Sequence, residues 1–289
     1  MLVACGLLTA NDALLKSLVA SLPVGQVVGI RGIFALGFVI LLTPWLGGVK
    51  RLKARSHRDV LLCSGLLVFN IVAFPFCLPH MPLADAIILA YTSPIWVVAL
   101  APLLLKEKTN WQQWGAVLTG FGGAWLVIKP GVGGVHWAVF LALLIAFVVG
   151  LRDIITRKIA FRESALSIVA YTNFLSIMLG LISIPLGWIA ISTLQIGQLV
   201  ISGLFFSVSQ IMMVEAFRLA EATVLSTFKY SSILFAAGFG YLFWGELLDV
   251  YVWLGAILII LSGLIIVRYR QKPIPTLSEV LPRAARRLD

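Results

Sequence analysis

The sequence predicts an all-α integral membrane protein with ten transmembrane helices, arranged as two inverted five-helix repeats. Three observations support this fold class: the chain is 61% hydrophobic and 12% charged, it divides into apolar runs of helical length, and its second half resembles its first. Soluble domains are about 25% charged, so this chain has too little polar surface to cover a soluble core. The net charge of +10 does not predict nucleic-acid binding, because the basic residues lie mostly between the apolar runs.

Ten apolar runs are expected to span the membrane, since a spanning helix needs about 20 mainly apolar residues. They lie near residues 2–20, 25–46, 59–78, 83–105, 111–128, 137–157, 165–187, 197–217, 221–244 and 251–268. The alternation over about ten residues that is typical of a membrane β-barrel is absent. The cysteines lie in apolar runs without CxxC spacing, so we expect neither a metal site nor a disulfide framework.

The basic residues predict how the helices are oriented. The linker 50–58 and the tail after residue 268 are rich in Lys and Arg, whereas the linkers on the other side contribute only Lys129. Such residues favour the cytoplasmic side, which places both termini in the cytoplasm of a multi-pass protein of the bacterial inner membrane. The tail 269–289 is expected to contact anionic lipid.

The two halves of the chain repeat each other at nearly constant spacing. The segment LADAIIL recurs as LAEATVL, and further matches are Asp12 with Asp153, Lys16 with Arg157, Pro44 with Pro185, and Glu107 with Glu246. The first repeat covers residues 1–128 and the second covers 137–268. An odd number of spans in each half inverts the second copy, an arrangement typical of secondary transporters with a site near the bilayer midplane.

The end of each repeat carries a recognisable pattern. In the first half, small residues are followed by Pro94, then by Glu107, and then by a glycine-containing helix; the second half has Tyr230 in place of the proline. This pattern resembles the EamA type of the drug/metabolite transporter superfamily. The sequence ANDALLKSL followed by Arg31 is similar to a subgroup of S-adenosylmethionine and riboflavin carriers. The resemblance implies a secondary carrier with a small-molecule substrate, no cofactor and no ATPase motif, as a monomer or a homodimer in the lipid bilayer.

Charged residues inside the first two spans are the main candidates for a site. A charge at the bilayer centre costs roughly 2.5–3.5 kcal/mol on insertion scales. Asp12 and Lys16 share one helix face, and Arg31 in the next span is expected to reach the same region. We expect the three side chains to form a cluster that binds a polar or zwitterionic ligand or carries a proton. The alternative is a salt bridge that fixes the packing of the first two spans.

Further candidates are polar or aromatic side chains at membrane depth and residues at bends or span ends. The substrate-binding candidates are Asn11, Asn70, Tyr91, Trp96, Asp153, Tyr171, Gln210, Lys229 and Tyr230. The candidates for a hinge or a gate are Pro94, Glu107 and Glu246. Each substrate-binding candidate has a competing role in packing or in hydrogen bonding between helices.

These observations predict secondary active transport of a small organic metabolite by alternating access. An amino-acid-like or heteroaromatic substrate is expected, and proton coupling is left open. A lipid-carrier flippase or a channel of the same fold is the alternative. A membrane-embedded enzyme is disfavoured, because the three histidines lie in or beside linkers and lack HExxH spacing.

Overall fold

All the regular secondary structure in the part of the chain that the computed structural model describes is helical. The described residues are 1–45, 48–90, 92–104, 111–128, 136–159, 162–219, 231–247 and 249–268. Within them there is no β-strand. The all-α prediction is therefore confirmed for these residues.

The helices follow the expected apolar runs closely. The first half contains α1 (Leu2–Val19), α2 (Val24–Leu42), the short η1 (Val49–Leu52), α3 (His57–Cys77), α4 (Leu83–Ala90), α5 (Ser93–Leu104) and α6 (Trp111–Ile128). The second half contains α7 (Trp137–Ile159), α8 (Ala165–Ile182), the short η2 (Ile184–Leu186), α9 (Thr193–Leu219), α11 (Ser231–Trp244) and α12 (Val250–Arg268).

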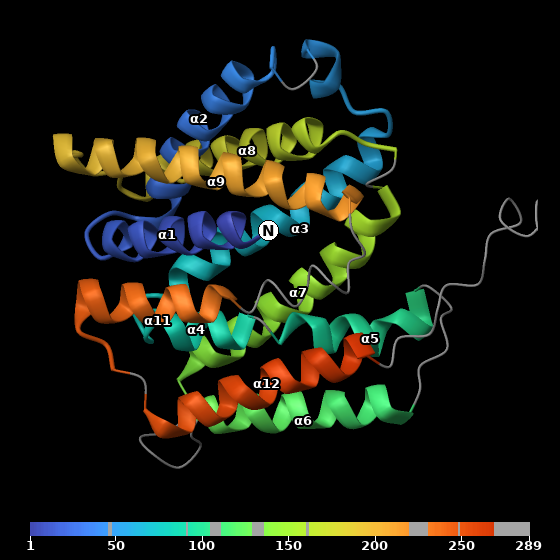
Figure 1. The fold of residues 1–289 in the computed structure, drawn as a ribbon. Helices are drawn as coiled ribbons and strands as arrows, with labels where there is room; N and C mark the ends of the chain where they lie inside the picture. Colours follow the sequence, from blue (N-terminus) through green and yellow to red (C-terminus); the bar gives the residue numbers. More distant parts are fainter. Residues whose placement is uncertain are drawn as a thin grey trace, which may run out of the picture.

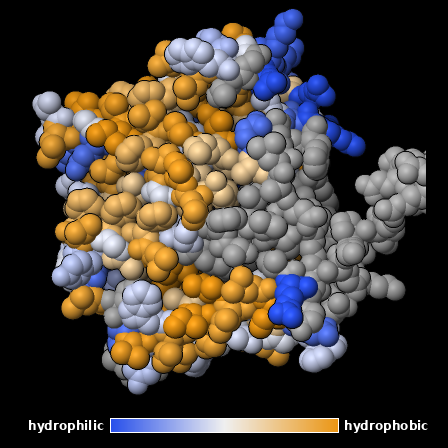
Figure 2. Space-filling view, in the orientation of Figure 1, coloured by the Kyte–Doolittle hydropathy of each residue, from blue (hydrophilic) through white to orange (hydrophobic). Residues whose placement is uncertain are grey.

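Six of these helices are long and apolar enough to cross a membrane, by length and composition. They are α1, α2, α3, α7, α8 and α9, and four shorter apolar stretches lie along α4–α5, α6, α11 and α12. Large apolar side chains cover the helix sides, and in Leu118 and Phe140, for example, well over half of the surface is exposed. Figure 2 shows hydrophobic residues over much of the visible face. In water such a surface would favour aggregation, so these helices belong in a bilayer.

The run expected as a single span over 83–105 is broken. Helix α4 ends at Ala90 and α5 begins at Ser93. At the break, the Thr92 hydroxyl donates a hydrogen bond to the carbonyl oxygen of Leu89 over 2.8 Å. Pro94 is the second residue of α5, in the first turn, where a missing N–H leaves no helical bond unmade. In the run 221–244, the described helix is α11, and residues 220–230 lie outside the described part.

Two pairs of helices from opposite halves approach each other through glycines. Helix α2 packs along α8, and α6 packs along α12; Figure 1 shows α6 and α12 side by side at one edge of the molecule. A Cβ at Gly29 would lie 2.8 Å from the Cα of Gly180, and one at Gly123 would lie 2.7 Å from the carbonyl oxygen of Gly255. Small residues that let helix backbones meet are typical of membrane proteins.

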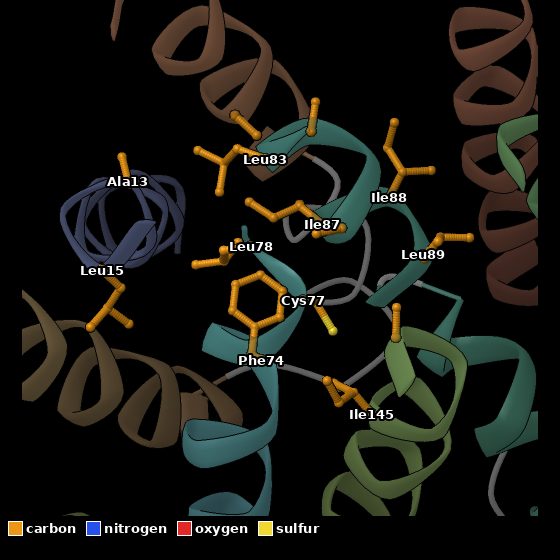
Figure 3. Packing of buried hydrophobic residues seen from close by; sticks show 14 of the residues in the cluster. Ala13, Leu15, Phe74, Cys77, Leu78, Leu83, Ile87, Ile88, Leu89 and Ile145 are labelled. Atoms are coloured by element: carbon orange, nitrogen blue, oxygen red, sulfur yellow. The ribbon is translucent and has the colours of Figure 1, made fainter. Parts of the chain in front are cut away.

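The largest apolar cluster surrounds the short helix α4. Leu83 and Ile87 of α4 lie near Phe74 of α3 and Leu15 of α1, and Ile145 comes from α7 (Figure 3). Helix α4 also packs against α11 and α7. This cluster therefore joins the two halves and lies directly beside the site described below.

Candidate functional site

A cavity of about 110 Å³ lies between helices of the two halves. Its lining comes from α1, α2, α3 and α4 in the first half and from α7 and α9 in the second. The polar side chains in this lining are Asn11, Asp12, Arg31, Asn70, Arg152 and Gln210. Pockets for drug-sized ligands are about 300–1,000 Å³, so this cavity has room for part of such a molecule or for several waters.

Asn11 connects three of these helices. It is 1% exposed, and its Oδ1 accepts hydrogen bonds from the Ser202 hydroxyl of α9 over 2.7 Å and from Nη1 of Arg31 of α2 over 3.4 Å. Its Nδ2 donates to Oδ1 of Asp12 over 3.0 Å. The amide thus has partners for both its oxygen and its nitrogen, and it holds Asp12 and Arg31 beside the cavity.

Arg31 is buried, and Asp12 lies close enough to interact with it electrostatically but forms no ion pair with it. Its side chain is 2% exposed, and the guanidinium carbon lies 4.6 Å from the ring centre of Phe206. This arrangement gives a cation–π attraction of about 0.5–2 kcal/mol. Its Nε is buried and has no hydrogen-bond partner. Neither the amide of Asn11 nor the ring of Phe206 supplies the full negative charge that a buried guanidinium favours.

Arg152 of α7 lies at the position that corresponds to Asn11 in the sequence repeat, and it is partly buried. Its Nη2 donates to Oε1 of Gln210 over 3.3 Å, which joins α7 to α9. The Nε of Arg152 is also buried without a partner. Like Arg31, it has one amide oxygen as a hydrogen-bond partner and no ion pair with an acid among the described residues.

Helix α3 has an internal proline where it borders the cavity. Pro75 lacks an N–H, so it cannot donate the helical hydrogen bond that the carbonyl of Ile71 would otherwise accept. Ile71 and Pro75 both line the cavity. The carbonyl group of Ile71 therefore lacks its helical hydrogen bond from residue 75, and it lies close to the polar side chains of the cavity.

Lys16 does not join the expected cluster. Its Nζ forms an ion pair with Oε1 of Glu246 and lies 4.9 Å from the ring centre of Trp244. The other carboxylate oxygen of Glu246 accepts a hydrogen bond from the backbone N–H of Leu83 over 3.1 Å. Lys16 was expected to form one cluster with Asp12 and Arg31, but it is absent from the cavity lining that contains those two residues. One turn along α1 is enough for Lys16 to reach the connection between α11 and α12 instead of the cavity.

The other candidate residues fall into three groups. Asn70 and Gln210 line the cavity with Asn11, Asp12 and Arg31. Trp96, Asp153 and Tyr171 are not part of the lining. The side chains outside the described part are those of Tyr91, Pro94, Glu107, Lys229 and Tyr230.

Two of the candidates outside the lining have clear packing roles. Trp96 packs edge-on against Phe121 and Phe147, with ring centres 5.5 and 5.3 Å apart. The hydroxyl of Tyr171 lies 2.7 Å from Nδ1 of His57, and this contact joins α8 to the start of α3. Neither ring is placed to stack on a ligand in the cavity.

Three lining or supporting residues were missed as site candidates: Arg152, Ser202 and Phe206. By the repeat, Arg152 and Asp153 correspond to Asn11 and Asp12; both members of the first pair line the cavity, but only Arg152 of the second pair does. Ser202 begins an SGL segment that also occurs at residues 64–66; this match between the halves indicates the repeat but not a contact with Asn11. Nothing local distinguishes Phe206 from the other aromatic residues of the chain.

Comparison with known proteins links this fold to membrane transport. The model of the EamA-like transporter family matches residues 1–129 and 136–268. The pseudopaline exporter CntI of Pseudomonas aeruginosa is 29% identical over 267 residues, which cover 90% of this chain and 92% of the relative. The S-adenosylmethionine uptake transporter of Rickettsia felis is 26% identical over 267 residues, 91% and 90% of the two chains. The riboflavin transporter of Rhizobium johnstonii is 28% identical over 236 residues, 80% and 78% of the two chains.

A solved crystal structure has the same fold. It superposes with a TM-score of 0.69 over 99% of this chain and 96% of the other, at 16% sequence identity. The arrangement of helices therefore occurs in a protein with a very different sequence.

Proposed function

This chain belongs to the EamA-like transporter family, and we propose that it is a secondary active transporter that carries a small organic metabolite by alternating access. One observation carries the proposal: the cavity lies between the two halves and is lined by Asp12, Arg31 and Arg152. Ionisable groups at membrane depth are costly and mark substrate or ion pathways. A site between two halves is where a carrier can be reached from either side in turn.

The helix contacts support two inverted halves, residues 1–128 and 137–268. In the repeat, α1, α2 and α3 correspond to α7, α8 and α9. Exchanging the halves therefore converts the α1–α9 contact into an α7–α3 contact, and the α2–α9 contact into an α8–α3 contact. All four contacts occur. The pairs α2–α8 and α6–α12 are unchanged by the exchange, and both pack closely. This agreement favours a ten-span carrier with pseudo-twofold symmetry.

The size of the cavity also favours a moving carrier. At about 110 Å³, it is too small for a whole molecule of S-adenosylmethionine or riboflavin. A substrate of that size requires the helices around the cavity to move apart. Helix α4, which is short and ends at a break beside the cavity, is a suitable place for such a movement.

The ion pair between Lys16 and Glu246 is our proposed gate at one end of the cavity. It joins α1 of the first half to the α11–α12 connection of the second half and to the start of α4. By the sequence repeat, Arg157 and Glu107 occupy the equivalent positions, although their side chains lie outside the described part. We expect that pair to close the opposite end when the first gate opens.

The proposed orientation follows from the basic residues. With both termini in the cytoplasm of the bacterial inner membrane, the end of α1 that carries Lys16 lies on the non-cytoplasmic side. The gate of Lys16 and Glu246 then closes that side. Arg55 and Ser56 lie at the cytoplasmic side, where their backbone N–H groups donate to the carboxylate of Glu163 over 2.9 and 2.6 Å.

The relatives suggest a substrate of amino-acid-like or heteroaromatic chemistry. Their names include an S-adenosylmethionine transporter, a riboflavin transporter and a pseudopaline exporter. At identities of 25–29%, the shared fold does not fix one substrate. The direction of transport differs among the names as well, since two describe uptake or transport and one describes export.

Uptake into proteoliposomes tests this function. The panel holds labelled S-adenosylmethionine, riboflavin, aromatic and small amino acids and a lipophilic cation, each with and without a pH gradient. We expect saturable uptake of at least one compound, lost in Asp12→Asn and retained in the matched control Asp59→Asn, because Asp59 is exposed at the start of α3. Equal uptake by the wild type and by Asp12→Asn would contradict the site, and no uptake above empty liposomes would contradict the function.

A further inference from the structure

The described lining of the cavity carries more positive than negative charge. Its ionisable side chains are two arginines, Arg31 and Arg152, and one acid, Asp12, which gives a net charge of +1. Among the described residues, no ion pair joins either arginine to an acid. A surplus cation at membrane depth is destabilising until an anion or water compensates it.

Both arginines keep hydrogen-bond donors without a protein partner. A guanidinium has five N–H donors in a fixed fork, and each arginine uses one nitrogen on an amide oxygen, of Asn11 or of Gln210. The Nε of Arg31 and the Nε of Arg152 are buried and unpartnered. Amide and aromatic neighbours fix the position of a guanidinium and leave its charge unneutralised.

We infer that the substrate carries a carboxylate and that Arg31 and Arg152, one from each half, bind it in this cavity. This inference rests on the proposed function. Arginine is suited to the task because its planar fork matches the two oxygens of a carboxylate. A carboxylate bound by both arginines at once would also draw the two halves together.

The charges favour a carboxylate over a phosphate monoester. One carboxylate brings the charge of the described lining from +1 to zero. A dianionic phosphate would leave a negative excess next to the carboxylate of Asp12, which Asn11 holds at the same cavity. A neutral substrate would leave the surplus positive charge of the described lining uncompensated.

Matched pairs of compounds test this inference. In proteoliposomes, uptake of S-adenosylmethionine is compared with uptake of its decarboxylated form, tryptophan with tryptamine, histidine with histamine, and riboflavin 5′-phosphate with riboflavin. We expect uptake only of compounds with a carboxylate, and Arg31→Gln and Arg152→Gln to raise the KM of a carried compound by about 10- to 100-fold. Arg58→Gln is the matched control, because Arg58 is exposed before the cavity-lining part of α3.

The outcomes separate this inference from the proposed function. Saturable uptake of an amine, of riboflavin or of its phosphate with no carboxylated compound carried would leave the transporter standing and overturn the carboxylate. Uptake of a carboxylated compound with an unchanged KM in both arginine variants would overturn the assignment to these residues. No uptake of any compound would count against both. Size-exclusion profiles and the conservative variants Arg31→Lys and Arg152→Lys distinguish loss of binding from loss of folding.

Discussion

Lys16 and Arg31 are both cations within the first two spans, and the protein treats them differently. Lys16 has a carboxylate partner, Glu246, which also accepts the backbone N–H of Leu83. Arg31 is more deeply buried and has an amide and an aromatic ring instead. Lys16 therefore joins two parts of the protein, whereas the charge of Arg31 remains available at the cavity.

This contrast has a physical basis in what each contact can do. A partly buried ion pair holds its two helices in one arrangement, because separating the partners leaves a charge poorly solvated. A buried guanidinium with spare donors gains most when an external anion supplies the missing charge. The first arrangement suits a gate and the second suits a ligand site.

The largest effect on stability is expected when one partner of the ion pair is removed. Glu246→Gln leaves Lys16 without an anion, although its side chain is only 10% exposed, and should lower the free energy of unfolding by about 3 kcal/mol. The double variant Lys16→Met/Glu246→Gln should recover part of this loss, since neither charge remains. Denaturant unfolding in detergent, followed by tryptophan fluorescence, measures both. A double variant less stable than Glu246→Gln would show that the pair is not what stabilises this contact.

A smaller loss of stability is expected when the close packing of α9 against the backbone of α2 near Arg31 is disturbed without changing any charge. A Cβ at Gly203 of α9 would lie 3.0 Å from the backbone nitrogen of Ala35 and 3.2 Å from the carbonyl oxygen of Arg31. Gly203→Ala should therefore cost about 1–3 kcal/mol of stability and weaken substrate binding. Gly197→Ala on the same helix is the control, because a Cβ there meets nothing within 4 Å. Equal unfolding midpoints for the two variants would contradict the close packing of α2 and α9.

The hydrogen bond from Ser202 to Asn11 should contribute less. Ser202→Ala removes one of the two donors to Oδ1 of Asn11 and should cost about 1 kcal/mol. Ser209→Ala, also fully buried on α9, removes only a local bond to the carbonyl of Phe206. The KM for the carried compound, relative to the wild-type KM, should therefore be larger for Ser202→Ala than for Ser209→Ala. The reverse order would argue against the role of Asn11.

The smallest effect is expected at Tyr171. Its hydroxyl contacts His57 and not the cavity, so Tyr171→Phe should change uptake of the carried compound by less than about twofold, as for an exposed hydrogen bond of modest net value. Uptake kinetics in proteoliposomes measure this directly. A large rise in KM would show that Tyr171 reaches the substrate in another arrangement of the helices.

The sequence predicted α1, α2, α3, α7, α8 and α9 well because each is a long apolar run, and length with composition is sufficient for that prediction. The break between α4 and α5 was harder to predict from the sequence. Pro94 indicated a bend, but the helix ends at Ala90, where Thr92 bonds back to Leu89. Such a break depends on local hydrogen bonds that composition does not reveal.

Part of the cavity lining was predicted from the sequence. Asn11, Asp12, Arg31, Asn70 and Gln210 do line one cavity, since polar groups in apolar helices tend to face one another. The partner of Lys16 could not be found from spacing, because Glu246 is 230 residues away and only the packing of α1 against α11 brings them together. Whether the lining residues bind substrate stays a prediction.

The most direct test of the account compares the two kinds of charge in one binding measurement. Purified wild type, Arg31→Gln and Lys16→Met/Glu246→Gln are titrated with a compound that the wild type carries, and the Kd is measured by calorimetry. We predict a Kd at least about tenfold weaker for Arg31→Gln and a Kd near the wild-type value for the double variant, because Arg31 lines the cavity and Lys16 and Glu246 do not. Unchanged affinity in Arg31→Gln, with binding lost in the double variant, would contradict it.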